Sequence, residues 1–132
     1  MAKLVTQGMR NLLTAVLCFC SLFVFSQQTI YQETGESLYE DALSLYQSNN
    51  YIVALEKLES YLDQNGALKN EAIYYRAMCL LKSGDIRGER ELESFVQSNQ
   101  NHPLASSAYF YLGNFYFTKG DLKKARKSYE TT

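Results

Sequence analysis

The sequence predicts an all-α fold made of repeated helical hairpins, and two observations carry this prediction. Three turn signals recur with starts 35 and 36 residues apart, each joining a helix-breaking residue to a good N-cap: Asn49-Asn50-Tyr51, Gly84-Asp85-Ile86 and Gly120-Asp121-Leu122. A small residue stands seven positions before each signal, at Ala42, Ala77 and Gly113. Such regular spacing indicates one supersecondary unit repeated along the chain.

The first helix of each unit is predicted from the apolar residues around its small residue. They stand four positions before it (Leu38, Ile73, Tyr109) and three after it (Leu45, Leu80, Tyr116). This spacing puts them on one helical stripe. A small residue within that stripe lets a second helix approach closely, as an antiparallel hairpin requires.

The second helix of each unit follows its turn signal. Apolar residues have helical spacing after the first signal, at Tyr51, Ala54, Leu55, Leu58, Tyr61 and Leu62, and after the third, at Leu122, Ala125 and Tyr129. In the second unit the matching residues stand one position early, at Gly88, Leu92 and Phe95. We therefore expect that turn to be one residue shorter, with a longer loop through Gln97 to His102 in compensation.

These residues resemble the tetratricopeptide repeat (TPR) family. The third unit matches the family pattern most closely, through Tyr109, Leu112-Gly113, Tyr116, Ala125 and Tyr129, and Pro103 stands where the second unit should end. The resemblance covers residues 35–132. It implies a TPR-type helical-hairpin solenoid of about two and a half to three repeats, with a protein or peptide partner bound along the concave face of the first helices.

The first 26 residues are predicted to be a cleaved signal peptide, followed by a lead-in over residues 27–34. Lys3 and Arg10 precede an apolar run from Leu12 to Phe25, which is shorter than the roughly 20 residues of a membrane-spanning helix. We expect cleavage after Ser26 and no stable transmembrane anchor. Exported bacterial TPR proteins offer the nearest resemblance, so a periplasmic or outer-membrane-associated location is expected. The large residues before Cys18 and Cys20 fit lipidation poorly.

The composition offers few groups for catalysis. A formal net charge of -1 gives no reason to bind nucleic acid. The only histidine, His102, is expected to be solvated or to cap a helix, and Cys79 to be a small buried apolar group. The acidic residues Glu89, Glu91 and Glu93, and the basic run from Lys119 to Lys127, are expected to form solvated helix faces. We predict no catalytic residues, no metal site and no cofactor.

The predicted partner-binding residues lie on the first helix of each unit, at fixed positions around the small residue. They are Tyr39, Leu43, Tyr46, Tyr74, Met78, Leu81, Phe110, Asn114 and Phe117. For each aromatic residue, packing between neighbouring helices is an alternative that we weight equally with partner binding. The predicted function is a protein-interaction scaffold of the cell envelope; the alternative is a structural or oligomerisation module, or an accessory domain of a larger envelope protein.

The third unit is expected to be truncated at its C-terminal end. Its second helix has about ten residues after Leu122, and an internal repeat exposes an apolar flank that a neighbour normally covers. We expect Leu112, Phe115, Tyr116 and Tyr129 to face water, and self-association through this open end.

Overall fold

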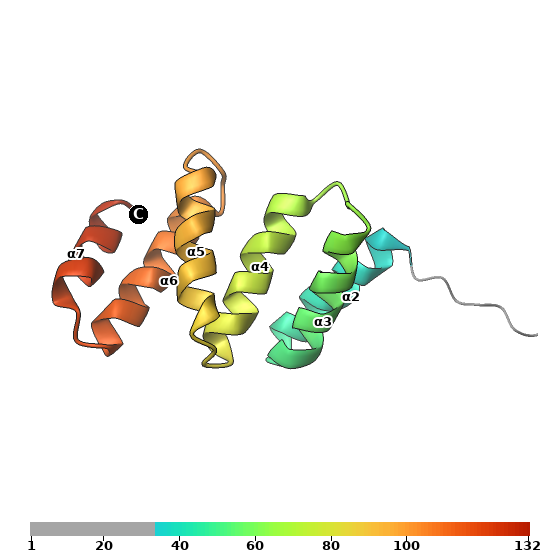
Figure 1. Ribbon diagram of the computed structural model, residues 1–132, viewed down its shortest axis with the longest axis horizontal. Coiled ribbons are helices and arrows are strands. Elements are labelled where there is room, and N and C mark those ends of the chain that lie inside the picture. Colours follow the sequence, from blue (N-terminus) through green and yellow to red (C-terminus); the bar gives the residue numbers. More distant parts are fainter. Residues whose placement is uncertain (1–33) are drawn as a thin grey trace, which may run out of the picture. The chain divides into compact units, whose positions relative to one another are not determined.

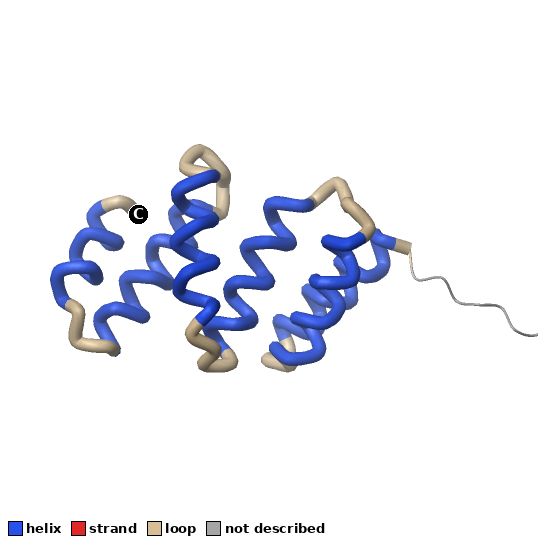
Figure 2. The backbone as a smooth tube through the Cα atoms, in the orientation of Figure 1, coloured by secondary structure: helices blue, strands red, loops and turns tan. Residues whose placement is uncertain are grey.

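The computed structural model describes residues 34–132, which belong to one compact unit, Glu33–Thr132. The predicted signal peptide and its cleavage site lie outside the described residues. Within 34–132 all regular structure is helical (Figures 1 and 2). The helices are α2 (Gly35–Gln47), α3 (Tyr51–Asp63), α4 (Lys69–Lys82), α5 (Arg87–Ser98), α6 (Ala105–Thr118) and α7 (Leu122–Glu130).

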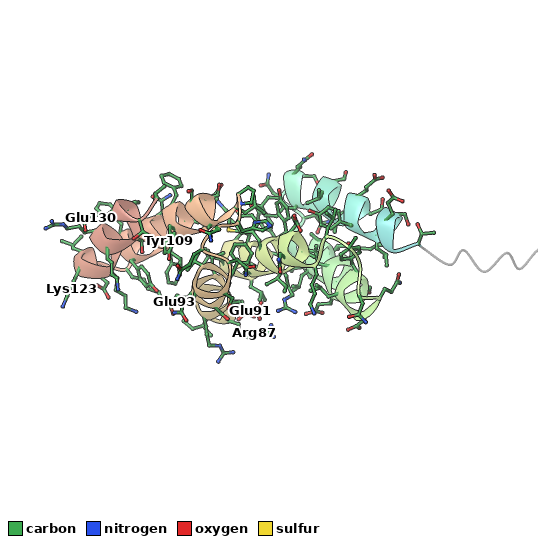
Figure 3. The ribbon with its side chains drawn as sticks, turned by 90° about the horizontal axis from the view of Figure 1, so that it is seen from above. Arg87, Glu91, Glu93, Tyr109, Lys123 and Glu130 are labelled. Carbon is green, nitrogen blue, oxygen red and sulfur yellow. The ribbon has the colours of Figure 1, made fainter. Side chains whose placement is uncertain are left out.

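The helices form three hairpins, α2–α3, α4–α5 and α6–α7, as the sequence predicts. Each helix contacts the next one along the chain, and α2 also contacts α4. In Figure 3, α2 and α6 lie along one side of this unit, while α3 and α5 lie along the other. Two clusters of buried side chains make up the core, one between the first two hairpins and one between the second and third.

The predicted turn signals end the first helices because each contains a residue in the left-handed backbone region. Asn49, Gly84 and Gly120 have φ values of 62°, 82° and 78°, a conformation that glycine and asparagine adopt most readily. After the third turn, the Asp121 carboxylate accepts a hydrogen bond from the backbone N–H of Lys124 at 3.0 Å and so caps α7.

The buried residues of α5 stand one position nearer the turn than those of α3, as predicted: Gly88 is four residues after Gly84, whereas Ala54 is five after Asn49. The helix itself begins at Arg87, one residue later after its turn signal than α3 and α7. The N–H of Gly88 donates to the carbonyl of Asp85, three residues back, whereas Ala54 and Ala125 donate four residues back, to Asn50 and Asp121. The first turn of α5 is therefore a 3₁₀ turn. A Cβ on Gly88 would stand 2.6 Å from Cα of Leu81, so α5 approaches the backbone of α4 very closely.

The compensating loop lies two residues later than predicted. Helix α5 continues to Ser98, where the prediction placed the loop from Gln97, and α6 begins only at Ala105. His102 shapes this loop: its Nδ1 accepts a hydrogen bond from the N–H of Leu104 at 3.2 Å, and its ring packs against Phe95. His102 was predicted to be solvated or to cap a helix; its side chain instead bonds within the loop and is 16% exposed, and α6, whose N-cap is Leu104, has no side-chain cap.

The flank of α6 is less open than predicted. Leu112 and Tyr116 are only 2% and 4% exposed, because α5 and α7 cover them. The Tyr116 hydroxyl also donates a hydrogen bond to the Glu93 carboxylate of α5. The prediction that these two side chains face water is therefore wrong, whereas Tyr129 of α7 is 39% exposed.

The acidic residues of α5 do not form a solvated face. Glu91 accepts a hydrogen bond from Arg76 at 3.0 Å, which joins α5 to α4. Glu89 lies 3.3 Å from Lys119 and 3.8 Å from Lys124, which joins the second hairpin to the third. The prediction of a solvated face was wrong because these glutamates pair with basic residues from other helices. The sequence of α5 alone does not show which basic residues lie next to it.

Candidate functional site

A group of tyrosines crosses all three first helices and forms the candidate binding surface, here called the tyrosine face: Tyr46 of α2, Tyr75 of α4 and Tyr111 of α6. The rings of Tyr46 and Tyr75 meet edge to face with centroids 5.2 Å apart. Tyr111 packs edge to face on Phe110 at 5.8 Å, which extends the run of rings along α6. All three tyrosines are partly buried, so packed neighbours hold each ring and leave part of it open to solvent.

A positive charge lies beside this surface. Lys82, near the end of α4, places its Nζ 4.9 Å from the ring centroid of Tyr111, a cation–π contact. Burial, with a smaller contribution from the nearby Tyr111, raises the pKa of Tyr46 to about 12. The Tyr46 hydroxyl is therefore neutral at ordinary pH, when it can both donate and accept hydrogen bonds.

Three of the predicted partner-binding residues lie in the core instead. Tyr39 is 8% exposed and packs on Tyr61, Tyr74 is 4% exposed and packs on Phe95, and Met78 is fully buried. Neighbouring helices cover these three side chains. For the aromatic residues, packing between helices was the role predicted with the same weight as partner binding. Tyr74 and Met78 therefore do not form the binding surface, and Tyr39 contributes only to the wall of a hollow beside α2.

The other six predicted residues keep contact with solvent. Leu43, Tyr46, Leu81 and Asn114 are partly buried, while Phe110 and Phe117 are 47% and 61% exposed. Asn114 accepts a hydrogen bond from the Tyr129 hydroxyl at 2.8 Å, so α7 fixes its side chain in place. These two phenylalanines of α6 are the most exposed of the set; Phe110 packs on Tyr129 of α7, and Phe117 lines a hollow with Leu122 and Tyr129.

At the other end, a hollow of about 580 Å³ opens beside α2. Tyr39 and Leu43, two of the predicted partner-binding residues, contribute to its wall. The carboxylates of Glu36 and Glu40 also line it. An apolar side chain of a partner would suit this wall, and a basic group of the partner would suit the edge formed by Glu36 and Glu40.

The sequence reasoning missed Tyr75, Tyr111 and Lys82. Tyr75 and Tyr111 each stand two positions before the small residue of their unit, where the first unit has Glu40. The recurrence of tyrosine in two of three units was the available signal. The contact between Lys82 and Tyr111 carried no such signal, because it joins two different hairpins.

Comparison with protein families matches the chain to a model described as a tetratricopeptide repeat, over residues 39–94 and 87–131. The matched residues make up well over half of the chain. The chain belongs to the tetratricopeptide repeat family. A search of curated proteins finds no match. Tetratricopeptide repeats generally mediate protein–protein interactions and are generally non-catalytic, which accords with a surface of aromatic rings.

The thiol of Cys79 lies in the core of these tetratricopeptide repeats. Cys79 is fully buried, and burial raises its pKa to about 11, which disfavours the reactive thiolate. Within residues 34–132, no three His, Cys, Asp or Glu side chains are grouped as metal ligands. Over the same stretch, no helix has the length and apolar character needed to cross a bilayer.

Proposed function

We propose that this protein is a non-catalytic scaffold of the cell envelope that binds a segment of a partner protein along the tyrosine face. The observation that supports this most is the arrangement of Tyr46, Tyr75 and Tyr111 across three successive hairpins. A surface that crosses several repeats suits an extended or helical segment, which can contact each repeat in turn.

The chemistry of the surface suggests what such a segment contains. Partly exposed aromatic rings that are held by their neighbours lose little conformational entropy on binding. Such rings commonly make the largest contributions to the binding free energy of an interface. Lys82 offers a cation beside Tyr111, and Glu36 and Glu40 line the hollow at the α2 end. We propose a segment with apolar or aromatic anchors, an acidic group opposite Lys82 and a basic group opposite the two glutamates.

Selection of peptides from a random display library tests this function. The protein is purified from its own host, so that it carries whatever N-terminal processing the host performs. Selected peptides are then titrated by fluorescence anisotropy against Tyr111→Leu, which keeps an apolar side chain but removes the ring. We expect affinity to fall about tenfold or more. Ile86→Ala is the control, because Ile86 is 69% exposed at the start of α5 and lies outside the tyrosine face.

Two outcomes contradict the proposal. One is a selection that enriches no peptide above the bare matrix. The other is a set of peptides that bind Tyr111→Leu and the unchanged chain equally well.

The envelope location is a separate part of the proposal and has its own test. It is supported by the short apolar run from Leu12 to Phe25 and the polar Gln27 after Ser26. We expect protein from the envelope fraction to begin at Gln27 on N-terminal sequencing. A chain that retains Met1 and stays embedded in the membrane would overturn the prediction of a cleaved signal.

A structural or oligomerisation module, or an accessory domain of a larger envelope protein, is the second candidate. The observation that favours it is the exposure of Phe117 and Leu122, at 61% and 63%, on the α6–α7 hairpin. This candidate predicts self-association of the purified chain, measured by sedimentation velocity.

A further inference from the structure

The loop between α3 and α4 (Figure 1) contains Asn65 and Gly66, the only place in the sequence where glycine follows asparagine. Asparagine is one of the thermally labile residues of proteins. In an asparagine–glycine pair, the backbone nitrogen of the glycine can attack the side-chain carbonyl of the asparagine, because glycine has no side chain to obstruct ring closure. In a folded protein, this reaction depends on how the structure holds the two groups.

The fold uses this pair for reasons unrelated to its reactivity. Asn65 follows the end of α3 with a φ of 52°, in the left-handed region that asparagine tolerates better than most residues. A Cβ at residue 66 would overlap the ring of Tyr61, which is 3% exposed. The Tyr61 hydroxyl also accepts a hydrogen bond from the N–H of Leu68 at 2.8 Å. The turn therefore favours asparagine followed by glycine.

The two reacting groups are free of hydrogen bonds. Among the residues that the structure describes, nothing accepts a hydrogen bond from the N–H of Gly66, and the exposed Asn65 side chain has no hydrogen-bond partner. Gly66 lies outside any helix and imposes little restriction on backbone rotation. Rotation about ψ of Asn65 can thus bring the nitrogen to the side-chain carbonyl carbon without breaking a hydrogen bond of either group.

Asn49 provides a comparison within the same protein. It is exposed, and its φ of 62° is close to that of Asn65. The N–H of the next residue, Asn50, donates to the carbonyl of Leu45 at 2.9 Å. The Asn49 side chain accepts a hydrogen bond from the Tyr51 hydroxyl. Both reacting groups are held at this turn, whereas neither is held at Asn65.

We propose that Asn65–Gly66 is a modification site, at which the chain converts its own asparagine to aspartate or isoaspartate. The Gly66 nitrogen loses its proton and bonds to the side-chain carbonyl carbon of Asn65; the bond to the side-chain nitrogen breaks, and ammonia leaves. Water then opens the succinimide ring. Addition at the side-chain carbonyl carbon gives aspartate, and addition at the backbone carbonyl carbon gives isoaspartate. Water is the co-reactant, and nothing is oxidised or reduced.

Both products alter the hollow of about 580 Å³ beside α2, whose wall includes Gly66 and Leu68. Each adds a carboxylate next to a wall that already has Glu36 and Glu40. Isoaspartate also lengthens the main chain by one methylene, which disturbs the packing of Gly66 on Tyr61. This inference goes beyond the proposed function and does not rest on it, because the reaction needs no partner.

Peptide mapping of the full chain, stored folded in mildly alkaline buffer at body temperature, tests the proposal. Trypsin cleaves after Lys57 and Lys69 and so releases residues 58–69. We expect this peptide to show the mass of an acid in place of an amide, in two forms that electron-transfer fragmentation identifies as aspartate and isoaspartate. Asn65→Gly is the control, because it removes the amide but keeps a residue suited to positive φ.

A second variant tests the importance of the free nitrogen. Asn50→Gly gives the first turn an asparagine–glycine pair as well, but one whose N–H donates to Leu45. We expect Asn49 in this variant to convert at least about tenfold more slowly than Asn65 in the same molecules. In urea, which unfolds the chain, the two rates should become similar.

The effect on the loop is measured on the products, which ion exchange separates by their added negative charge. The isoaspartate form is expected to unfold at a lower urea concentration than the unchanged chain, because the extra methylene disturbs the contact with Tyr61. Asn65→Asp adds the charge without the methylene and should keep the urea midpoint of the unchanged chain.

The proposal is overturned if Asn65 remains an amide in the folded chain over the time in which the chain in urea converts it. Equal rates at Asn49 and Asn65 in folded Asn50→Gly would show that the free Gly66 nitrogen is not the cause, and they overturn it as well. An isoaspartate form as stable as the unchanged chain would contradict the expected change in the hollow.

Discussion

Gly113 of α6 lies directly beneath the ring of Tyr129 of α7. A Cβ on Gly113 would stand 2.6 Å from Cδ1 of that ring and closer still to Cε1. The Tyr129 hydroxyl donates to Asn114, which holds the ring in this position. The absence of a side chain at residue 113 therefore allows the last two described helices to pack together.

Replacing Gly113 is expected to destabilise the fold through this ring. Gly113→Leu should lower the free energy of unfolding by about 1–3 kcal/mol, a typical cost of overpacking, as measured by urea denaturation. In a Tyr129→Ala background, Gly113→Ala should instead stabilise by roughly 0.5–1 kcal/mol, because alanine favours helices over glycine. Loss of stability by Gly113→Ala in that background would show that the ring is not the cause.

Gly88→Ala is expected to cost more than Gly113→Ala. The added Cβ would meet backbone atoms, with Cα of Leu81 at 2.6 Å and the carbonyl carbon of Leu80 at 2.8 Å. Backbone within a packed helix cannot swing aside as a side chain can. Thermal unfolding of the two variants compares them; equal melting temperatures would contradict the close approach of α5 to α4.

Tyr74→Ala is expected to reduce stability rather than binding alone. Tyr74 is 4% exposed and packs on Phe95 and Tyr75, and deletion of a buried aromatic side chain typically costs about 3–5 kcal/mol. Phe117→Ala, at an exposed position, is the comparison and should change stability little. Urea denaturation of both variants measures the difference in the free energy of unfolding. If Tyr74→Ala were as stable as the unchanged protein, Tyr74 would again be a candidate for the binding surface.

His102→Ala is expected to cost about 1 kcal/mol, a typical net contribution of one intramolecular hydrogen bond. The His102 side chain accepts a hydrogen bond from the N–H of Leu104 in the loop before α6 and lies 3.3 Å from the Glu71 carboxylate. His102→Asn should recover most of the loss, because an asparagine side chain also bonds the backbone two residues on. A His102→Asn variant no more stable than His102→Ala would show that this hydrogen bond is not the main contribution.

Stability is expected to fall in alkali. Burial raises the pKa of Tyr39 and of Tyr46 to about 12, from an ordinary value of 10. Between these values the unfolded chain releases protons that the folded chain retains, so the free energy of unfolding decreases as pH rises. Urea midpoints at about pH 8 and about pH 11 measure this loss. Tyr46→Phe should reduce it, whereas Phe110→Leu, which removes no titrating group, should not.

The helices could be predicted from the sequence because their signals are local. The left-handed residues Asn49, Gly84 and Gly120 and the spacing of apolar residues lie within each hairpin. The register of α5 was also predictable, because Gly88, Leu92 and Phe95 stand one position nearer the turn signal than their counterparts in the first unit. The 3₁₀ hydrogen bond that produces this register was found only in the structure.

The candidate site was harder to predict because exposure depends on which helix lies next to a residue. Tyr39 and Phe110 occupy the same repeat position, yet only Phe110 is exposed, since α4 packs over the first hairpin. The contacts between Glu89 and Lys119 and between Lys82 and Tyr111 likewise join different hairpins. Sequence spacing within one hairpin does not predict such pairs.

The polar stripe of α2 has a consequence for assembly. Ser37, Glu40 and Ser44 stand where α4 has Ala72, Tyr75 and Cys79, the side chains that pack on the first hairpin. Head-to-tail growth requires a surface of one copy to complement a surface of the next. A copy that approached another hairpin through α2 would bring polar groups to an apolar surface, so growth through α2 is disfavoured.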